Sequence, residues 1–109
     1  MSDGAPNLVF IFADQFRQQA VGCMGQDPVH TPNLDRLAEE GLVLTHAVSN
    51  RPVCSPHRAM LFTGQYPHAN GVLTNCYSPS VPYGNELRAD QRCFSDVLAD
   101  AGYACGYIG

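Results

Sequence analysis

The stretch that decides how this chain is interpreted is VCSPHRAMLFTG, residues 53–64. Ser55 is a good helix N-cap, and Pro56 suits the first helical position, where its missing N–H costs nothing. The apolar residues that follow continue the helix until Gly64 ends it. We therefore predict a loop that turns into a helix, with Cys54 at its N-terminal end.

This predicted helix end combines three features of chemical interest. Cys54 is a candidate nucleophile, and it lies where unpaired backbone N–H groups and the helix dipole favour an anion. Arg58 lies one turn into the helix and can bring its guanidinium back towards that end. On the spacing alone, a buried cysteine on a capped helix with a surface arginine explains the pattern equally well.

The segments on either side alternate between strand and helix patterns. The apolar run Leu8–Phe12 predicts a strand buried on both faces, followed by Asp14 at its carboxyl end, where open parallel sheets bind ligands. A turn or helix-cap role is the alternative for Asp14. Helices are predicted from Pro32 to Gly41 and around Phe94–Ala101, and further strands at Leu42–Val48 and Tyr103–Ile108. The alternation predicts an α/β fold with parallel pairing.

The segment Gln65–Arg92 is rich in Pro, Gly, Asn, Ser and Tyr, and we predict a long surface loop. Four of its side chains are candidates for contact with a substrate, but exposure to solvent on a surface loop is the simpler interpretation of each one. These are His68, Asn70, Asn75 and Tyr77.

Composition limits the class of protein. With 109 residues, 45% hydrophobic and 15% charged, the chain is one domain at most and is not composed like a disordered protein. We expect the isolated piece to be only marginally stable, because few helices are available to cover a sheet. The formal net charge of −4 disfavours nucleic acid and anionic membranes as partners. The five cysteines show no zinc or disulfide spacing.

The amino terminus predicts the compartment. The polar start MSDGAP, residues 1–6, does not resemble a secretory signal, and no stretch is long enough to span a bilayer. The sequence as written therefore predicts a cytoplasmic protein, or a periplasmic or secreted one if a leader has been removed.

The segment CSPHR at 54–58, with Thr63-Gly64 shortly after, resembles the C-x-P-x-R signature of the type I sulfatases. NLVFIFADQ at 7–15 resembles that family's first strand with its metal-binding aspartate, and TPNLDRLA at 31–38 resembles a family helix. AGY and GYIG at the carboxyl end resemble the stretch that leads into a segment with a lysine and a histidine. These matches, in family order, cover essentially the whole chain.

The resemblance implies the N-terminal part of an alkaline-phosphatase-like parallel sheet sandwiched by helices. Residues 1–109 would be the N-terminal portion of a sulfatase catalytic domain, because the sequence stops at Gly109, where the family's lysine and histidine begin. Since those residues and further metal ligands belong to the family's site, we predict no sulfatase activity for the 109-residue polypeptide by itself.

The resemblance also implies a chemistry. In this family a formylglycine-generating enzyme oxidises the motif cysteine, here Cys54, and a hydroxyl of the hydrated formylglycine attacks sulfur. A divalent metal, usually calcium, contacts that hydroxyl group and would bind Asp14. Gln15 stands where many members have a second aspartate, so it is a weaker, uncharged ligand. Arg58 would hold the hydroxyl, and the helix end would add backbone donors for the developing charge.

The implied substrate is a sulfate ester of a small molecule or carbohydrate. Phosphonate monoester and phosphodiester hydrolases of the same superfamily resemble these segments and use the same motif, so they are the alternative. A different class stays open too: a non-catalytic fragment or binding module in which Cys54 remains a thiol.

Overall fold

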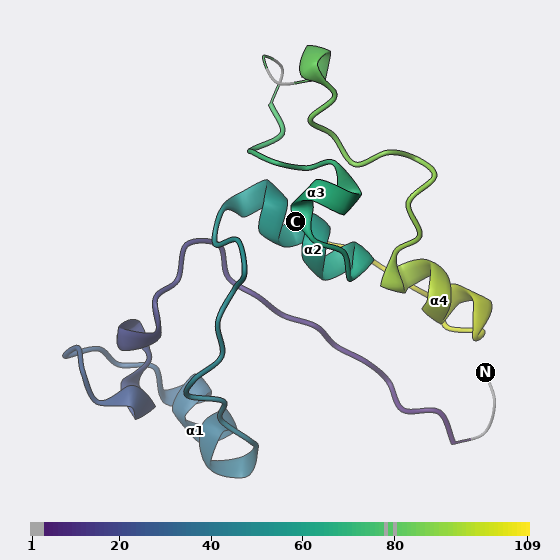
Figure 1. Ribbon diagram of the computed structural model, residues 1–109. Helices are drawn as coiled ribbons and strands as arrows, with labels where there is room; N and C mark the ends of the chain where they lie inside the picture. The colour runs from purple at the N-terminus through teal and green to yellow at the C-terminus, as the bar shows by residue number, and fades with distance from the viewer. Residues whose placement is uncertain (1–3, 78, 80) are drawn as a thin grey trace. The chain divides into compact units, whose positions relative to one another are not determined.

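The computed structural model describes residues 4–77, 79 and 81–109. The regular structure of this part of the chain is helical (Figure 1). Its α-helices are α1 (Pro32–Glu40), α2 (Cys54–Thr63), α3 (Pro67–Asn70) and α4 (Phe94–Asp100), and its 3-10 turns are η1 (Gln18–Ala20), η2 (Gly22–Met24) and η3 (Val81–Tyr83). None of the described helices has the length and apolarity that crossing a membrane requires.

The chain divides into two compact units. The α2 unit consists of residues 4–9 and 49–109 and contains α2, α3 and α4. The α1 unit consists of residues 10–48 and contains α1 with the turns η1 and η2.

In the α1 unit, helix α1 begins and ends where the sequence predicted, between Thr31 and Gly41. Thr31 does not cap its own helix but accepts the Gly22 N–H (2.7 Å), and its hydroxyl donates to Asp35 Oδ1 (2.9 Å). Asp35 Oδ1 also accepts the Cys23 N–H at 2.7 Å. The start of α1 therefore caps η2. Gly22 allows this close approach, since a Cβ there would lie 2.7 Å from Asp35 Oδ2.

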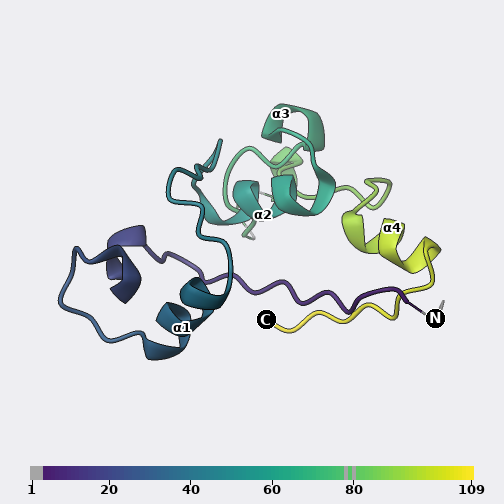
Figure 2. The same cartoon turned by 90° about the horizontal axis from the view of Figure 1, so that it is seen from below.

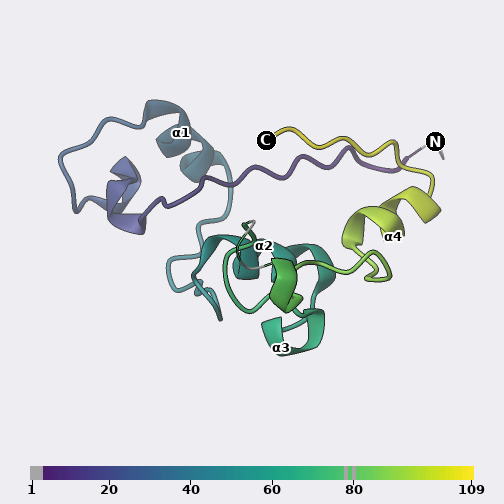
Figure 3. The ribbon, with the colours of Figure 1, turned by 90° about the horizontal axis from the view of Figure 1, so that it is seen from above.

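The α2 unit has a small core around α2 and α3. Helices α3 and α4 both pack against α2 (Figure 3). The Phe62 ring of α2 stacks on Phe94 of α4 with centroids 5.4 Å apart, and it meets Tyr107 at 6.0 Å. Among the residues whose burial is described, the buried ones all lie in this unit: Pro56, Ala59, Asn70, Val72 and Asn85.

The predicted strands are not formed as hydrogen-bonded ladders within the described residues. The segments 8–12 and 103–108 are open traces without strand arrows (Figure 2), and the third, 42–48, is broken by a turn at Thr45 and His46. A strand needs a neighbour for its N–H and C=O groups. The apolar side chains of these segments are also exposed, with Ile11 at 87% and Ile108 at 100%.

Candidate functional site

Helix α2 starts at Cys54, two residues earlier than the sequence predicted. Val53 has extended backbone (φ −130°, ψ 138°) and is the N-cap, so Cys54, Ser55 and Pro56 form the first turn. The prediction that Ser55 caps the helix is wrong, because its hydroxyl accepts the Cys76 N–H at 3.0 Å instead. Proline is tolerated in this turn since the first N–H groups of a helix have no intrahelical partner.

Two backbone donors at this helix end are used within the protein. The Val53 N–H donates to Arg51 O (2.8 Å), and the Ser55 N–H donates to Asn75 Oδ1 (3.1 Å). Pro56 has no N–H to offer. The prediction that this turn presents its backbone donors to an anion is therefore wrong for these residues, although the helix dipole still favours negative charge there.

Cys54 and Arg58 lie on the same face of α2, because residues four apart in a helix are neighbours along one side. Cys54 is exposed and Arg58 is half-buried. Gly64 ends the helix as predicted: it has φ 67°, and its N–H donates to Met60 O at 2.8 Å. The structure thus places a thiol and a permanent positive charge one helical turn apart.

His57, the variable position before the motif arginine, contacts the connector of residues 49–53 that precedes α2. Its Nδ1 lies 2.7 Å from Ser49 Oγ, and both residues are half-buried. In the same connector, Arg51 donates to Leu73 O at 3.3 Å. No sequence pattern predicted these contacts, which hold the segment that delivers Cys54.

The described part of the segment 65–92 contains α3 and η3, so it has more regular structure than the predicted surface loop. Asn70 is completely buried, and its carboxamide donates to Gln65 O (3.0 Å) and accepts the Val72 N–H (2.9 Å). The idea that Asn70 faces a substrate is therefore wrong, because its side chain closes the turn after α3. His68 and Tyr77 are exposed.

Asn85, which sequence reasoning missed, anchors the backbone between α3 and η3. It is 7% exposed. Its Oδ1 accepts the N–H groups of Leu73 (2.8 Å) and Thr74 (2.9 Å), and its Nδ2 donates to Thr74 O (2.9 Å) and Asn75 O (3.2 Å). A carboxamide can do this because it carries both donors and acceptors. Asn85 thereby holds the backbone that carries Asn75, whose side chain reaches α2.

Asp14 and Gln15, the predicted metal ligands, lie in the α1 unit. Both are exposed, and the Gln15 N–H donates to Asp14 Oδ1 at 3.0 Å. Their oxygens are hard donors of the kind that calcium prefers. Across the described residues, no group of three or more His, Cys, Asp and Glu side chains is arranged to hold a metal ion.

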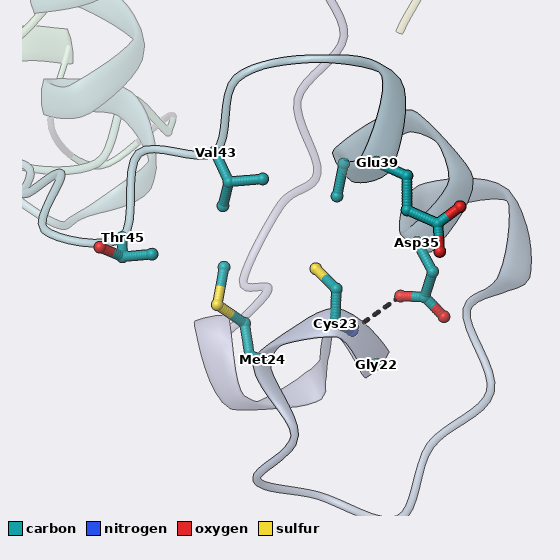
Figure 4. Close-up of a pocket in the computed structure, with 8 residues that line it drawn as sticks. Gly22, Cys23, Met24, Asp35, Glu39, Val43 and Thr45 are labelled. Carbon is teal, nitrogen blue, oxygen red and sulfur yellow. Dashed lines mark hydrogen bonds between the residues drawn. The ribbon is translucent and has the colours of Figure 1, made fainter.

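The α1 unit also has an open pocket of about 560 Å³ (Figure 4). Sulfur atoms of Cys23 and Met24 and the Val43 side chain supply much of its apolar lining, and the Asp35 carboxylate accepts the Cys23 N–H. The complete lining is Gly22, Cys23, Met24, Asp35, Ala38, Glu39, Val43 and Thr45. Asp14 and Gln15 are not part of it.

Residues 6–109 match the Sulfatase family model. The chain belongs to the sulfatase family. This sulfatase sequence is 48% identical to an endo-4-O-sulfatase of Bacteroides thetaiotaomicron, over 95% of this chain and 22% of that protein. It is 42% identical to an ulvan-active sulfatase of Formosa agariphila, over 95% of this chain and 19% of that protein. The sulfatase chain thus spans about a fifth of the length of these curated relatives.

A solved structure agrees with this assignment. The crystal structure of yidJ from Bacteroides fragilis is 58% identical to the sulfatase chain, with a TM-score of 0.92, covering 95% of this chain and 22% of that one. The match supports the predicted alkaline-phosphatase-like fold, whereas the sheet itself is not formed among the described residues. Sulfatases are sulfuric ester hydrolases, and in general they use a formylglycine and a divalent metal.

Proposed function

We propose that residues 1–109 are the N-terminal portion of a sulfatase catalytic domain and that formylglycine made from Cys54 is its nucleophile. The observation that supports this is the position of Cys54: it is exposed at the first residue of α2, with Arg58 on the same face. Exposure makes the thiol accessible to a formylglycine-generating enzyme. Once hydrated, the aldehyde would supply a hydroxyl group whose attack on sulfur displaces the alcohol of the ester.

Two features of the chain itself, Arg58 and the dipole of α2, would act on charge at this site. Arg58 is a permanent cation one turn from Cys54, so it would hold the hydroxyl group and offset negative charge on the sulfate. The dipole of α2 adds a partial positive charge at the same end. Because Ser55 N–H is bonded to Asn75 and Pro56 has no N–H, backbone donors play a smaller part than the motif suggested.

We further propose Asp14 and Gln15 as part of a calcium site. Their carboxylate and amide oxygens are suitable ligands, and the hydrogen bond from Gln15 N–H to Asp14 orients the carboxylate. Calcium takes about six to eight oxygen ligands, so these residues fit part of a shell and not a whole one. A divalent metal bound there would polarise the sulfate oxygens. The apolar segments 8–12 and 103–108 are proposed as strands of the family's parallel sheet.

The proposed substrate is a sulfate ester of a carbohydrate. Two of the relatives are named for carbohydrates, the ulvan-active sulfatase of Formosa agariphila and an N-acetylglucosamine-6-O-sulfatase of Bacteroides thetaiotaomicron. The alternative, hydrolysis of phosphonate monoesters or phosphodiesters, would use the same Cys54 and Arg58. A non-catalytic role would leave Cys54 as a thiol.

The test uses the natural polypeptide, in the length that its host makes. Mass spectrometry of the peptide with Cys54 should find the aldehyde, and the protein should hydrolyse a sulfate ester faster than the matched phosphonate ester. Cys54→Ala should lower kcat by at least roughly 10³-fold, since it removes the nucleophile. Cys23→Ala, which removes another exposed cysteine, should retain activity.

Each contrary result identifies an alternative. Faster hydrolysis of the phosphonate ester would assign the chain to the other branch of the superfamily. An unmodified Cys54 thiol without hydrolysis of either ester would leave the non-catalytic role.

A further inference from the structure

We propose that Asn75 is a positioning residue for the nucleophile, acting through Ser55. The inference rests on the proposed function of Cys54. Asn75 Oδ1 accepts the Ser55 N–H at 3.1 Å, and Ser55 is the residue directly after Cys54 in the first turn of α2. Asn75 is twenty residues away along the chain, so this bond is made by the fold and not by the helix.

The first turn of α2 needs such support. The first N–H groups of any helix have no intrahelical partner, and helix ends fray when nothing else holds them. The N-cap residue Val53 makes no side-chain capping bond, and Pro56 cannot donate. The Ser55 N–H is a first-turn donor that an outside acceptor can hold in place, and Asn75 supplies that acceptor.

The neighbouring loop residue strengthens the attachment. The Cys76 N–H donates to Ser55 Oγ at 3.0 Å, so two successive loop residues bind both the backbone and the side chain of Ser55. Since Ser55 is covalently joined to Cys54, a turn held in this way restricts the Cα position of the nucleophile. Displacement of a reacting group by about 1 Å can lower a rate by roughly 100-fold.

The loop that carries Asn75 is itself anchored. The buried carboxamide of Asn85 binds the backbone of Leu73, Thr74 and Asn75. Asn75 is half-buried. The path from Asn85 through this loop to Ser55 is a continuous set of hydrogen bonds that ends beside Cys54, so Asn75 is presented by a fixed support.

The kinetic test compares two substitutions of Asn75 in the natural polypeptide. Asn75→Ala removes the acceptor, and kcat should fall roughly 10- to 100-fold with little change in KM and unchanged formylglycine content. Asn75→Asp keeps an oxygen acceptor for Ser55 N–H, and a carboxylate is favourable at a helix N-terminus. This variant should therefore retain kcat within about threefold of the wild type. Asn50→Ala, at an exposed asparagine of the same unit, is the matched control.

The two variants separate positioning from substrate contact. A residue that donated a hydrogen bond to the sulfate would be inactivated by Asn75→Asp as well as by Asn75→Ala. Loss of activity in both variants, or full activity in Asn75→Ala, would overturn the inference.

Hydrogen exchange of the Ser55 amide tests the contact without any assay of activity. Exchange should be roughly tenfold faster in Asn75→Ala and near the wild-type rate in Asn75→Asp and Asn50→Ala. If the wild-type protein hydrolyses no sulfate ester, that result contradicts the proposed function and not the role of Asn75. The exchange rate of the Ser55 amide decides separately whether Asn75 holds the turn that carries Cys54. Unchanged exchange in Asn75→Ala would refute the inference.

Discussion

Substitution of Asn85 by alanine should release the loop of residues 73–75 from its anchor. The Asn85 carboxamide makes four hydrogen bonds to the backbone of this loop, at 2.8, 2.9, 2.9 and 3.2 Å. Alanine can make none of them. Because Asn85 is only 7% exposed, bulk water has little access to the hydrogen bonds that its side chain makes in the wild-type protein.

The expected change in free energy follows from these bonds. A neutral hydrogen bond stabilises a folded protein by about 1 kcal/mol net, so four bonds set an upper value of about 4 kcal/mol. Leu73 and Thr74 are exposed, so water can hydrate their freed backbone groups after a small movement of the loop. We therefore expect a loss of about 2 kcal/mol, which is roughly a 30-fold larger population of the open loop.

Amide hydrogen exchange at Leu73 and Thr74 measures this opening, because their N–H groups are the ones that Asn85 accepts. Both amides should exchange roughly 30-fold faster in Asn85→Ala, while amides in α4 of the same unit should change little. Asn50→Ala should leave all of these rates as they are. An increase below about threefold at Leu73 and Thr74 would show that Asn85 does not hold the loop.

Two further predictions concern other parts of the chain. Gly22→Ala should destabilise the protein by about 1–3 kcal/mol in a urea unfolding experiment, since its Cβ would push the Asp35 carboxylate, 2.7 Å away, from η2. Gly106→Ala, with open space around it, should be tolerated, and equal stability of the two variants would contradict the packing argument. Burial, and secondarily the charge of Asp96, raises the pKa of the Cys93 thiol, so iodoacetamide should alkylate Cys93 more slowly than exposed Cys105 in mildly alkaline buffer. The pKa of Cys93 is higher in the folded state than in the unfolded state, so the full contribution of the protonated thiol to the free energy of unfolding is present below the ordinary thiol pKa. That contribution is lost as pH rises through the raised pKa. Cys93→Ser should abolish this loss of stability at alkaline pH.

The helices were largely predictable because their signals are local. Thr31-Pro32 and Gly41 bound α1, and Gly64 ends α2 in the left-handed conformation that glycine adopts readily. The family was recognisable for a related reason: the C-x-P-x-R motif is a short run of residues whose spacing is visible without any structure, and the family match confirmed it.

The strands show the limit of this approach. An apolar run such as Leu8–Phe12 indicates a segment that suits a sheet, but a strand exists only when another segment pairs with its backbone. The described residues supply no such partner for it. Periodicity therefore predicted which segments are apolar, and it could not predict their pairing.

The sequence by itself determined the helix boundaries at Gly41 and Gly64, the Cys54–Arg58 spacing and membership of the sulfatase family. Only the tertiary structure decided how the first turn of α2 is completed. Ser55 was expected to cap its own helix, whereas its N–H and hydroxyl are bound by Asn75 and Cys76. The physical reason is that the partners of a helix end lie far away in the chain, and only folding determines which distant donor or acceptor reaches it.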